Sequence, residues 1–248
     1  MNQENKRPEG KLSGDVKMES PFLTKLENFW YHYKWQTIFG VFFLIVLIVC
    51  LVQCSAKGRG DDAYIMYAGE YVLSPIEKED MKQTVASVGK DINGDGKVEI
   101  SFGMYTIRQR ADIEEQDPTN HRFFAEASAQ QLDLFDQEIL SGEATLCLLS
   151  PALFERVAAA GGFLPVSDYA PALTSDVLVS YNGTYCGVRL KDTALYQREG
   201  FKNLPEDTVF CVRRVGTMTS LFDKEGATAL HTANVEIAKA LLALAPLE

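Results

Sequence analysis

The clearest pattern along the chain is an uninterrupted apolar stretch near its start. Residues 35–54 contain no charged side chain, and the eleven residues from Val41 to Leu51 are all apolar. Twenty residues in a helix cover about 30 Å, the thickness of a bilayer's hydrocarbon core. The pattern therefore predicts one transmembrane helix. Its amino-terminal flank carries four aromatic residues of the kind found at a headgroup interface: Trp30, Tyr31, Tyr33 and Trp35.

The segments on either side of this span differ in character. Residues 1–20 are polar and are expected to be a disordered cytoplasmic tail, whereas residues 21–34 place apolar side chains at helical spacing. The latter pattern is typical of an amphipathic segment on a membrane surface. Residues 55–62 (SAKGRGDD) have the composition of a short flexible linker, and a domain follows over residues 63–248.

The end of the apolar stretch leaves one alternative to an uncleaved anchor. Its last four residues, LVQC, resemble a bacterial lipobox, in which a cysteine such as Cys54 is lipidated after cleavage. Because Gln53 stands where that motif has a small residue, we favour an uncleaved single-pass anchor. A short tail usually stays inside while a large domain is exported. We therefore expect a cell-membrane protein with its N-terminus in the cytoplasm and its C-terminal domain outside the cell.

Strand and helix patterns alternate in the first half of the domain. Short, largely apolar runs predict strands over residues 63–69, 97–107 and 144–150. Helical periodicity and end signals predict helices over residues 75–88, 121–140 and 151–160. Ser74 with Glu77 forms a capping-box pattern at the first of these helices. Such alternation is typical of parallel strands joined by helices.

The second half of the domain does not continue the alternation of strand and helix patterns. Residues 178–190 alternate around Asn182 and Gly183, which is a hairpin signal. A further strand is expected over residues 208–215, and a closing helix over residues 233–245 with Asn234 or Thr232 near its start. We therefore predict an α/β fold with a mostly parallel sheet, helices on both faces and a short hairpin addition.

Charge and cysteine content limit which partners, metal sites and disulfides the domain can have. The net charge is −10, and residues 1–54 carry six basic against five acidic side chains, so nearly all of the excess lies in the domain. Such a domain would be repelled by phosphates, which excludes nucleic acid as a partner. The five cysteines lack metal-site or framework spacing. A bridge between Cys186 and Cys211 is one interpretation, and buried free thiols are the favoured one.

Residues 90–101 (KDINGDGKVEIS) resemble the start of a calcium loop. Asp91, Asn93 and Asp95 occupy the first three oxygen positions of such a loop, and Glu99 the ninth. The twelfth position, which needs a bidentate carboxylate, is Phe102. The sequence therefore allows at most a weak calcium site, and a polar turn that needs no metal is the alternative.

Candidate binding residues follow from where ligands bind in parallel α/β sheets. The chain has three isolated histidines and none of the common catalytic motifs, so we do not expect an enzyme. Ligands in such sheets bind beyond the carboxyl ends of the strands, near the first turns of helices. The residues singled out in this way are Ala68, Gly69, Tyr71, Ser150, Pro151 and Tyr169. The alternative is that they are ordinary turn and capping residues.

One stretch of the domain resembles a known family. The run ATLCLLSPALFERVAAAGGFLPVSDY is similar to a segment of bacterial extracellular solute-binding proteins, through Ser150, Pro151, Gly161, Leu164, Pro165, Asp168 and Tyr169. The front of the chain resembles Gram-positive membrane-anchored proteins with similar outer domains. Solute-binding proteins have two lobes, and the segment after residue 165 is too short for a second one. The resemblance therefore implies a reduced, single periplasmic-binding-like lobe.

These expectations combine into two functional hypotheses. The first is a non-enzymatic, membrane-anchored module that binds a small solute or a cell-envelope partner. The second is a structural or accessory membrane protein whose outer domain contacts another membrane protein and holds no ligand. An aromatic pocket at the carboxyl ends of the strands would favour the first, and a filled crevice with an exposed apolar patch the second.

The orientation gives a first testable prediction. Protease added to intact cells is expected to remove the domain after residue 60 and to leave an N-terminal epitope tag intact, because the membrane shields the tail. Immunoblotting of the tag checks this result. A domain that survives while the tag is clipped would show the opposite topology.

Overall fold

The computed structural model describes residues 21–56, 60–109, 119–216 and 224–247. The chain divides into two compact units between residues 58 and 59. The first contains the helix α1, Pro21–Ala56, and the second contains the whole α/β domain. The predicted disordered tail over residues 1–20 lies outside the described residues.

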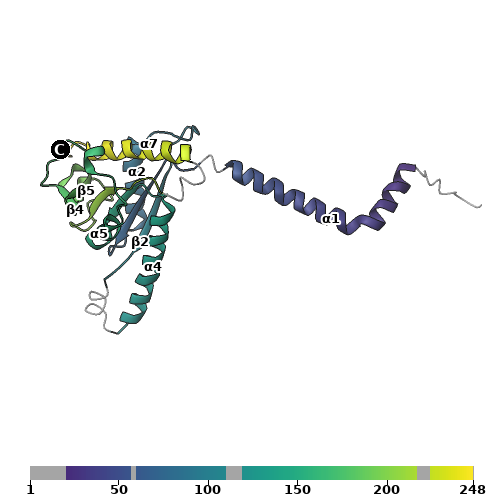
Figure 1. Ribbon diagram of the computed structural model, residues 1–248, viewed down its shortest axis with the longest axis horizontal. Helices are drawn as coiled ribbons and strands as arrows, with labels where there is room; N and C mark the ends of the chain where they lie inside the picture. Colours follow the sequence, from purple (N-terminus) through teal and green to yellow (C-terminus); the bar gives the residue numbers. More distant parts are fainter. Residues whose placement is uncertain (1–20, 57–59, 110–118, 217–223, 248) are drawn as a thin grey trace, which may run out of the picture. The chain divides into compact units, whose positions relative to one another are not determined.

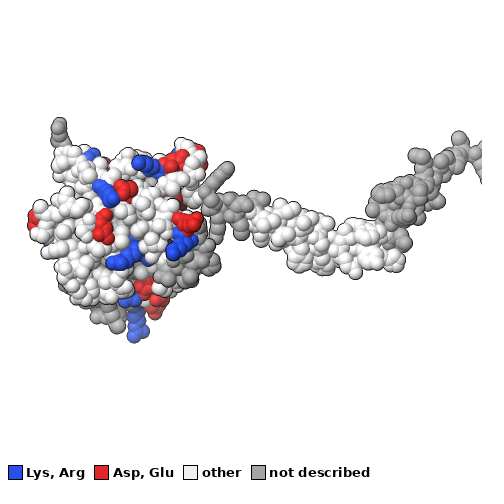
Figure 2. All heavy atoms as spheres, turned by 45° about the horizontal axis from the view of Figure 1, so that its top comes forward, with Lys and Arg blue, Asp and Glu red and all other residues white. Residues whose placement is uncertain are grey.

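Helix α1 is 36 residues long and joins the predicted juxtamembrane segment and span into one continuous helix. The stretch Phe29–Leu51 within it contains one charged residue, Lys34, and its most apolar 18-residue window has a mean hydropathy of 2.2. By length and composition, this is the one helix among the described residues that can cross a membrane. Figure 2 shows no charged side chain on the visible face of its described part, whereas acidic and basic side chains are intermixed on the domain.

The domain is built on a six-stranded sheet in the order β2-β1-β3-β6-β5-β4. Strand β1 pairs in parallel with β2 and β3, but the pairings of β6 with β3, of β5 with β6 and of β4 with β5 are antiparallel. The prediction of a mostly parallel sheet is therefore wrong, since the sheet is mixed. The strands are β1 Ala63–Gly69, β2 Ile100–Thr106, β3 Leu146–Leu149, β4 Leu178–Tyr181, β5 Thr184–Arg189 and β6 Val209–Val212.

The reason for the mixed sheet is the place that β6 takes. The chain returns after the β4–β5 hairpin and inserts β6 between β3 and β5, running opposite to β3. The hairpin itself forms as predicted, with Asn182 at φ 47° and Gly183 at φ 80° in its two-residue turn. Sequence periodicity marks β6 as a strand but carries no information on its neighbours.

Helices cover both faces of the sheet, as predicted (Figure 1). Helices α2 and α7 pack on one face, and α4 and α5 on the other. Helix α7 begins nine residues before its predicted start. Its first turns are mostly exposed and lack an apolar stripe, so hydrophobic periodicity does not reveal them. The helices are α2 Pro75–Val88, α4 His121–Ser141, α5 Pro151–Ala159 and α7 Lys224–Leu242, with 3-10 turns η1 Val166–Asp168, η2 Leu190–Asp192 and η3 Ala194–Gln197.

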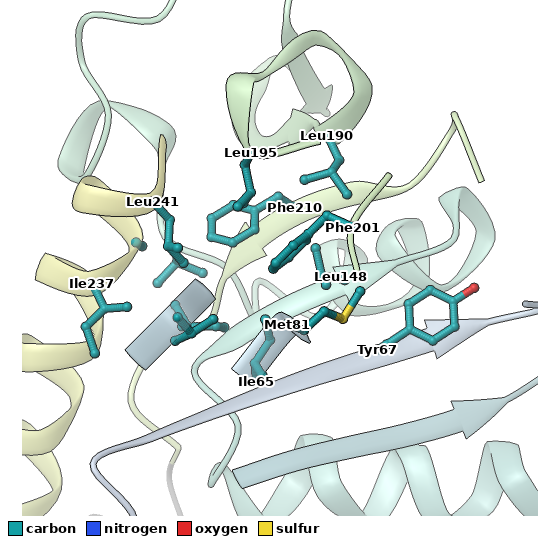
Figure 3. Packing of buried hydrophobic residues seen from close by; sticks show 14 of the residues in the cluster. Ile65, Tyr67, Met81, Leu148, Leu190, Leu195, Phe201, Phe210, Ile237 and Leu241 are labelled. Atoms are coloured by element: carbon teal, nitrogen blue, oxygen red, sulfur yellow. The ribbon is translucent and has the colours of Figure 1, made fainter. Parts of the chain in front are cut away.

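The larger core lies on the face covered by α2 and α7. Figure 3 shows Ile65, Leu148 and Phe210 of the sheet meeting Met81 of α2 and Leu241 of α7. On the opposite face, Cys147, Cys186 and Cys211 are buried. All three are free thiols, so no bridge joins Cys186 to Cys211.

A buried carboxylate fixes the amino-terminal edge of the sheet. Asp62, fully buried, accepts hydrogen bonds at Oδ1 from the backbone N–H groups of Ile92 (2.7 Å) and Asn93 (3.2 Å). Its Oδ2 accepts another from the N–H of Glu99 at 2.9 Å. One side chain thus holds both ends of the α2–β2 connector against the start of β1.

Replacement of this carboxylate should weaken the fold. The Asp62→Ala variant is expected to lose about 2–3 kcal/mol of unfolding free energy, because it leaves partly buried backbone donors unpaired. The control is Asp95→Ala, whose carboxylate accepts a single exposed N–H, that of Lys97. Urea unfolding of the full-length chain in detergent, followed by circular dichroism, measures both. An equal loss in the two variants would contradict the role given to Asp62.

Candidate functional site

The predicted crevice at the carboxyl ends of β1 and β3 is closely packed. The structure does bring Ala68, Gly69 and Ser150 together: the N–H of Ser150 donates to Ala68 O at 2.9 Å. The ring of Tyr67 lies across Gly69, where an added Cβ atom would come within 2.6 Å of the Tyr67 hydroxyl. The backbone at this point is therefore covered by a side chain of β1 itself.

The other three predicted ligand residues, Tyr71, Pro151 and Tyr169, differ in burial and in hydrogen bonding. Tyr71 donates from its hydroxyl to Glu77 Oε1 at 2.8 Å and from its N–H to the Tyr67 hydroxyl at 3.1 Å. Pro151 is exposed in the first turn of α5. Tyr169 is buried in the larger core, its hydroxyl has no partner among the described residues, and burial raises its pKa.

The predicted calcium residues form a tightly hydrogen-bonded loop. Asp91 accepts from the N–H groups of Gly94 (2.6 Å) and Gly96 (2.8 Å), and Asn93 Oδ1 accepts from that of Asp95 at 2.9 Å. These are side-chain-to-backbone bonds of the kind that shape polar turns. Among the residues described, no group of three or more His, Cys, Asp or Glu side chains is placed to hold a metal, and Glu99 is not joined to the others.

A cavity of about 480 Å³ lies at the opposite end of the sheet, at the amino ends of the parallel strands. Residues just before or within the starts of β1, β2 and β3 form one side, and α7 forms the other. Its lining residues are Gly60, Asp61, Tyr64, Ser101, Phe102, Gly142, Glu143, Thr145, Val215, Gly216, Ala227, Leu230, His231 and Asn234.

A chain of hydroxyl and carboxyl groups leads from this cavity into the domain. Half-buried Tyr64 lies beside Tyr105, which lies beside the carboxylate of Glu138. Gly103 on β2 leaves room for the Tyr64 ring, since an added Cβ atom would collide with its hydroxyl. Burial raises the pKa of all three side chains, most strongly that of Tyr64, so both phenols remain protonated at neutral pH.

Helix α7 supplies the most deeply buried polar group of the lining. Asn234 is 2% exposed, and its Nδ2 donates to Leu230 O at 2.8 Å and Asp62 O at 3.3 Å. Its Oδ1 has no hydrogen-bond partner among the described residues. One turn earlier, His231 Nε2 lies 2.6 Å from Arg213 O. The prediction that Asn234 stands near the start of the helix is wrong, because α7 begins ten residues before it.

Arg213 is a buried residue that does not line the cavity. It is 5% exposed, and its guanidinium donates to Glu138 O and Ala144 O, both at 3.3 Å, and to Ile139 O. The acceptors at residues 138 and 139 are carbonyls of the last turns of α4, where a positive charge is stabilising. The arginine is therefore held as a helix cap.

Three other hollows among the described residues are more open to solvent than this cavity. The largest is a groove of about 860 Å³ between α2 and the unpaired edge of β2. A hollow of about 360 Å³ lies between β2 and α4, and one of about 370 Å³ beside the β4–β5 hairpin. None of the four cavities is lined by the six predicted ligand residues, whose binding role stays a prediction.

Among the residues that line the amino-end cavity, Asn234 has a recognisable signal in the sequence. Asn234 stands in line with Ile237, Ala238 and Leu241, at the spacing of one helix face, so it is a polar residue within an apolar stripe. Asp61 and Tyr64 form one close pair in the sequence, and Glu143 and Thr145 form another. The two pairs lie far apart and follow no motif. Only the sheet order brings them to one place.

The chain matches no protein-family model, no curated protein and no solved structure. The likeness to solute-binding proteins therefore stays a prediction that rests on the residues quoted for it.

The capping box of α2 gives a pH-dependent prediction. The backbone N–H of Ser74, together with the side chains of Ser74 and Asn203, lowers the pKa of Glu77 to about 2. A carboxylate with a lowered folded-state pKa stabilises the fold above its ordinary pKa, and that contribution is lost as pH falls from about 4.5 toward 2. At pH 7, Glu77→Gln is expected to lose about 1 kcal/mol, after allowance for solvent screening.

The gap between wild type and Glu77→Gln should close at pH 2 to 3, because the wild-type carboxyl is then increasingly protonated. Urea unfolding at both pH values measures the gap. The control is Glu79→Gln, an exposed residue of the same helix paired with Lys82 at 3.5 Å, which should change stability little at either pH. A Glu77→Gln gap that is the same at both pH values would contradict the prediction.

Proposed function

We propose that the chain is a membrane-anchored, non-enzymatic binding module whose domain after residue 60 holds a small solute. The observation that carries the proposal is the cavity of about 480 Å³ at the amino ends of β1, β2 and β3. Small-molecule sites are typically concave, of 300–1,000 Å³, and lined by apolar groups with a few placed polar ones. This cavity combines Phe102, Leu230 and Ala227 with buried Asn234 and Thr145.

The location of the cavity departs from the hypothesis drawn from the sequence. Parallel α/β sheets usually bind ligands at the carboxyl ends of their strands. Here Tyr67 covers that end at Gly69, and the hollow lies where the chain enters the domain at Gly60 and Asp61. The periplasmic-binding-like likeness and the extracellular placement of the domain remain part of the proposal, supported by the resemblance and by the apolar helix α1.

A second candidate function is favoured by the groove between α2 and β2. Among the described residues, the outer edge of β2 has no strand neighbour in the sheet, so the backbone N–H and C=O groups on that side face outward. Open strand edges can accept a strand from another chain. An accessory protein that contacts another membrane protein through this edge would hold no solute.

A thermal-shift screen of the full-length chain in lipid nanodiscs separates the two candidates. Sugars, amino acids, peptides, amines and divalent cations are the classes to test. A bound solute at tenfold excess over its Kd adds about 1.4 kcal/mol, which raises the Tm by roughly 3–6 °C. We expect at least one class to give such a shift.

Two tryptophan variants test whether the solute that raises the Tm binds in the cavity. Ala227→Trp fills the lining and is expected to abolish the shift, whereas Ala229→Trp changes an exposed position of the same helix outside the lining and should leave it intact. Absence of any shift at concentrations far above a plausible Kd would overturn the solute-binding proposal in favour of the accessory role. A shift that survives Ala227→Trp would place the ligand elsewhere.

A further inference from the structure

Two polar side chains that line the amino-end cavity have their donors already engaged. The hydroxyl of Ser101 donates its proton to Asp61. Both N–H donors of the Asn234 amide are directed at carbonyl oxygens, Leu230 O and Asp62 O. What Ser101 and Asn234 can still offer to a ligand is acceptor oxygen.

The histidine of the lining fits the same description. Arg213 O can only accept, so the His231 Nε2 atom 2.6 Å from it carries a proton. In the neutral ring the other nitrogen, Nδ1, is then an acceptor. The unpartnered Oδ1 of 2%-exposed Asn234 is the most buried acceptor of the set, and an unpaired buried acceptor costs free energy that a ligand donor would recover.

The charge of the lining has one sign. Asp61 and Glu143 contribute carboxylates, and neither lysine nor arginine is present among the described lining residues. The one buried guanidinium nearby, that of Arg213, donates to carbonyls at the end of α4. The rings of Tyr64 and Phe102 also line the space, and aromatic faces attract cations.

We infer that the solute held in this cavity is a small organic ammonium ion that carries N–H donors. The inference rests on the proposed function and names its ligand class. An anion would be repelled by the two carboxylates, and a quaternary ammonium ion has no proton to donate to Asn234. A bare metal cation would leave the apolar part of a cavity of about 480 Å³ unfilled.

The test uses five small probes with the full-length chain in phosphatidylcholine nanodiscs, which carry no net charge that would attract a cation. The four organic probes are butylamine, butanol, butyrate and butyltrimethylammonium, which share one alkyl chain and differ in the polar group. Potassium chloride is the inorganic control. Ligand-observed NMR against empty nanodiscs measures affinity for the organic probes, and the thermal shift compares potassium with butylamine.

We expect butylamine to bind at least tenfold more tightly than butanol and butyltrimethylammonium, and butyrate not to bind. Asp61→Asn and Glu143→Gln should each weaken butylamine about three- to tenfold, with butanol unaffected. The control is Glu155→Gln, which removes the same charge at an exposed position of α5 outside the lining and should leave butylamine affinity unchanged.

The outcomes separate this inference from the proposed function. Equal binding of butanol and butylamine, binding of butyrate, a shift with potassium equal to that with butylamine, or a loss in Glu155→Gln equal to that in Asp61→Asn would overturn the ammonium assignment. The proposed function would survive these results if Ala227→Trp still abolished binding of the solute found. Failure of every probe and every class of the wider screen would overturn both.

Discussion

The carboxylate of Asp62 holds together the part of the domain on which the cavity depends. It is fully buried at the start of β1 and binds backbone N–H groups at both ends of the connector to β2. Its own backbone carbonyl accepts from Asn234 of α7. One residue therefore sets the distance between the sheet edge and the helix that face each other across the cavity, and its neighbour Asp61 lines that space.

A second constraint comes from the way the sheet is completed. Strand β1 is buried on both faces between β2 and β3, and the antiparallel strands extend the sheet beyond β3 only. At the carboxyl ends, the side chain of Tyr67 lies over Gly69 and Tyr169 is buried in the core. At the amino ends the strand side chains of Tyr64 and Phe102 line the hollow, and α7 borders it with polar residues. The hollow thus results from the order of the strands and from the presence of polar Asn234 and His231 on the face of α7 that lines it.

Local structure was largely predictable because its causes are local. Ser74 and Glu77 form the predicted capping box, and Asn182 with Gly183 forms the predicted turn. Both depend on backbone conformation and hydrogen bonds within a few residues. Hydrophobic periodicity predicts too late a start for α7 because its first turns have no apolar stripe, and it therefore places Asn234 near the helix start.

By itself, the sequence determined the apolar helix that can span a membrane, the alternation of strands and helices, and the covering of the sheet on both faces. These features follow from hydrophobic periodicity, which each segment carries on its own. Only the tertiary structure decided that β6 lies antiparallel between β3 and β5, and that Tyr64, Glu143 and Asn234 meet at one cavity. Pairings between distant segments depend on the packing of the whole chain, and no spacing along the sequence records them.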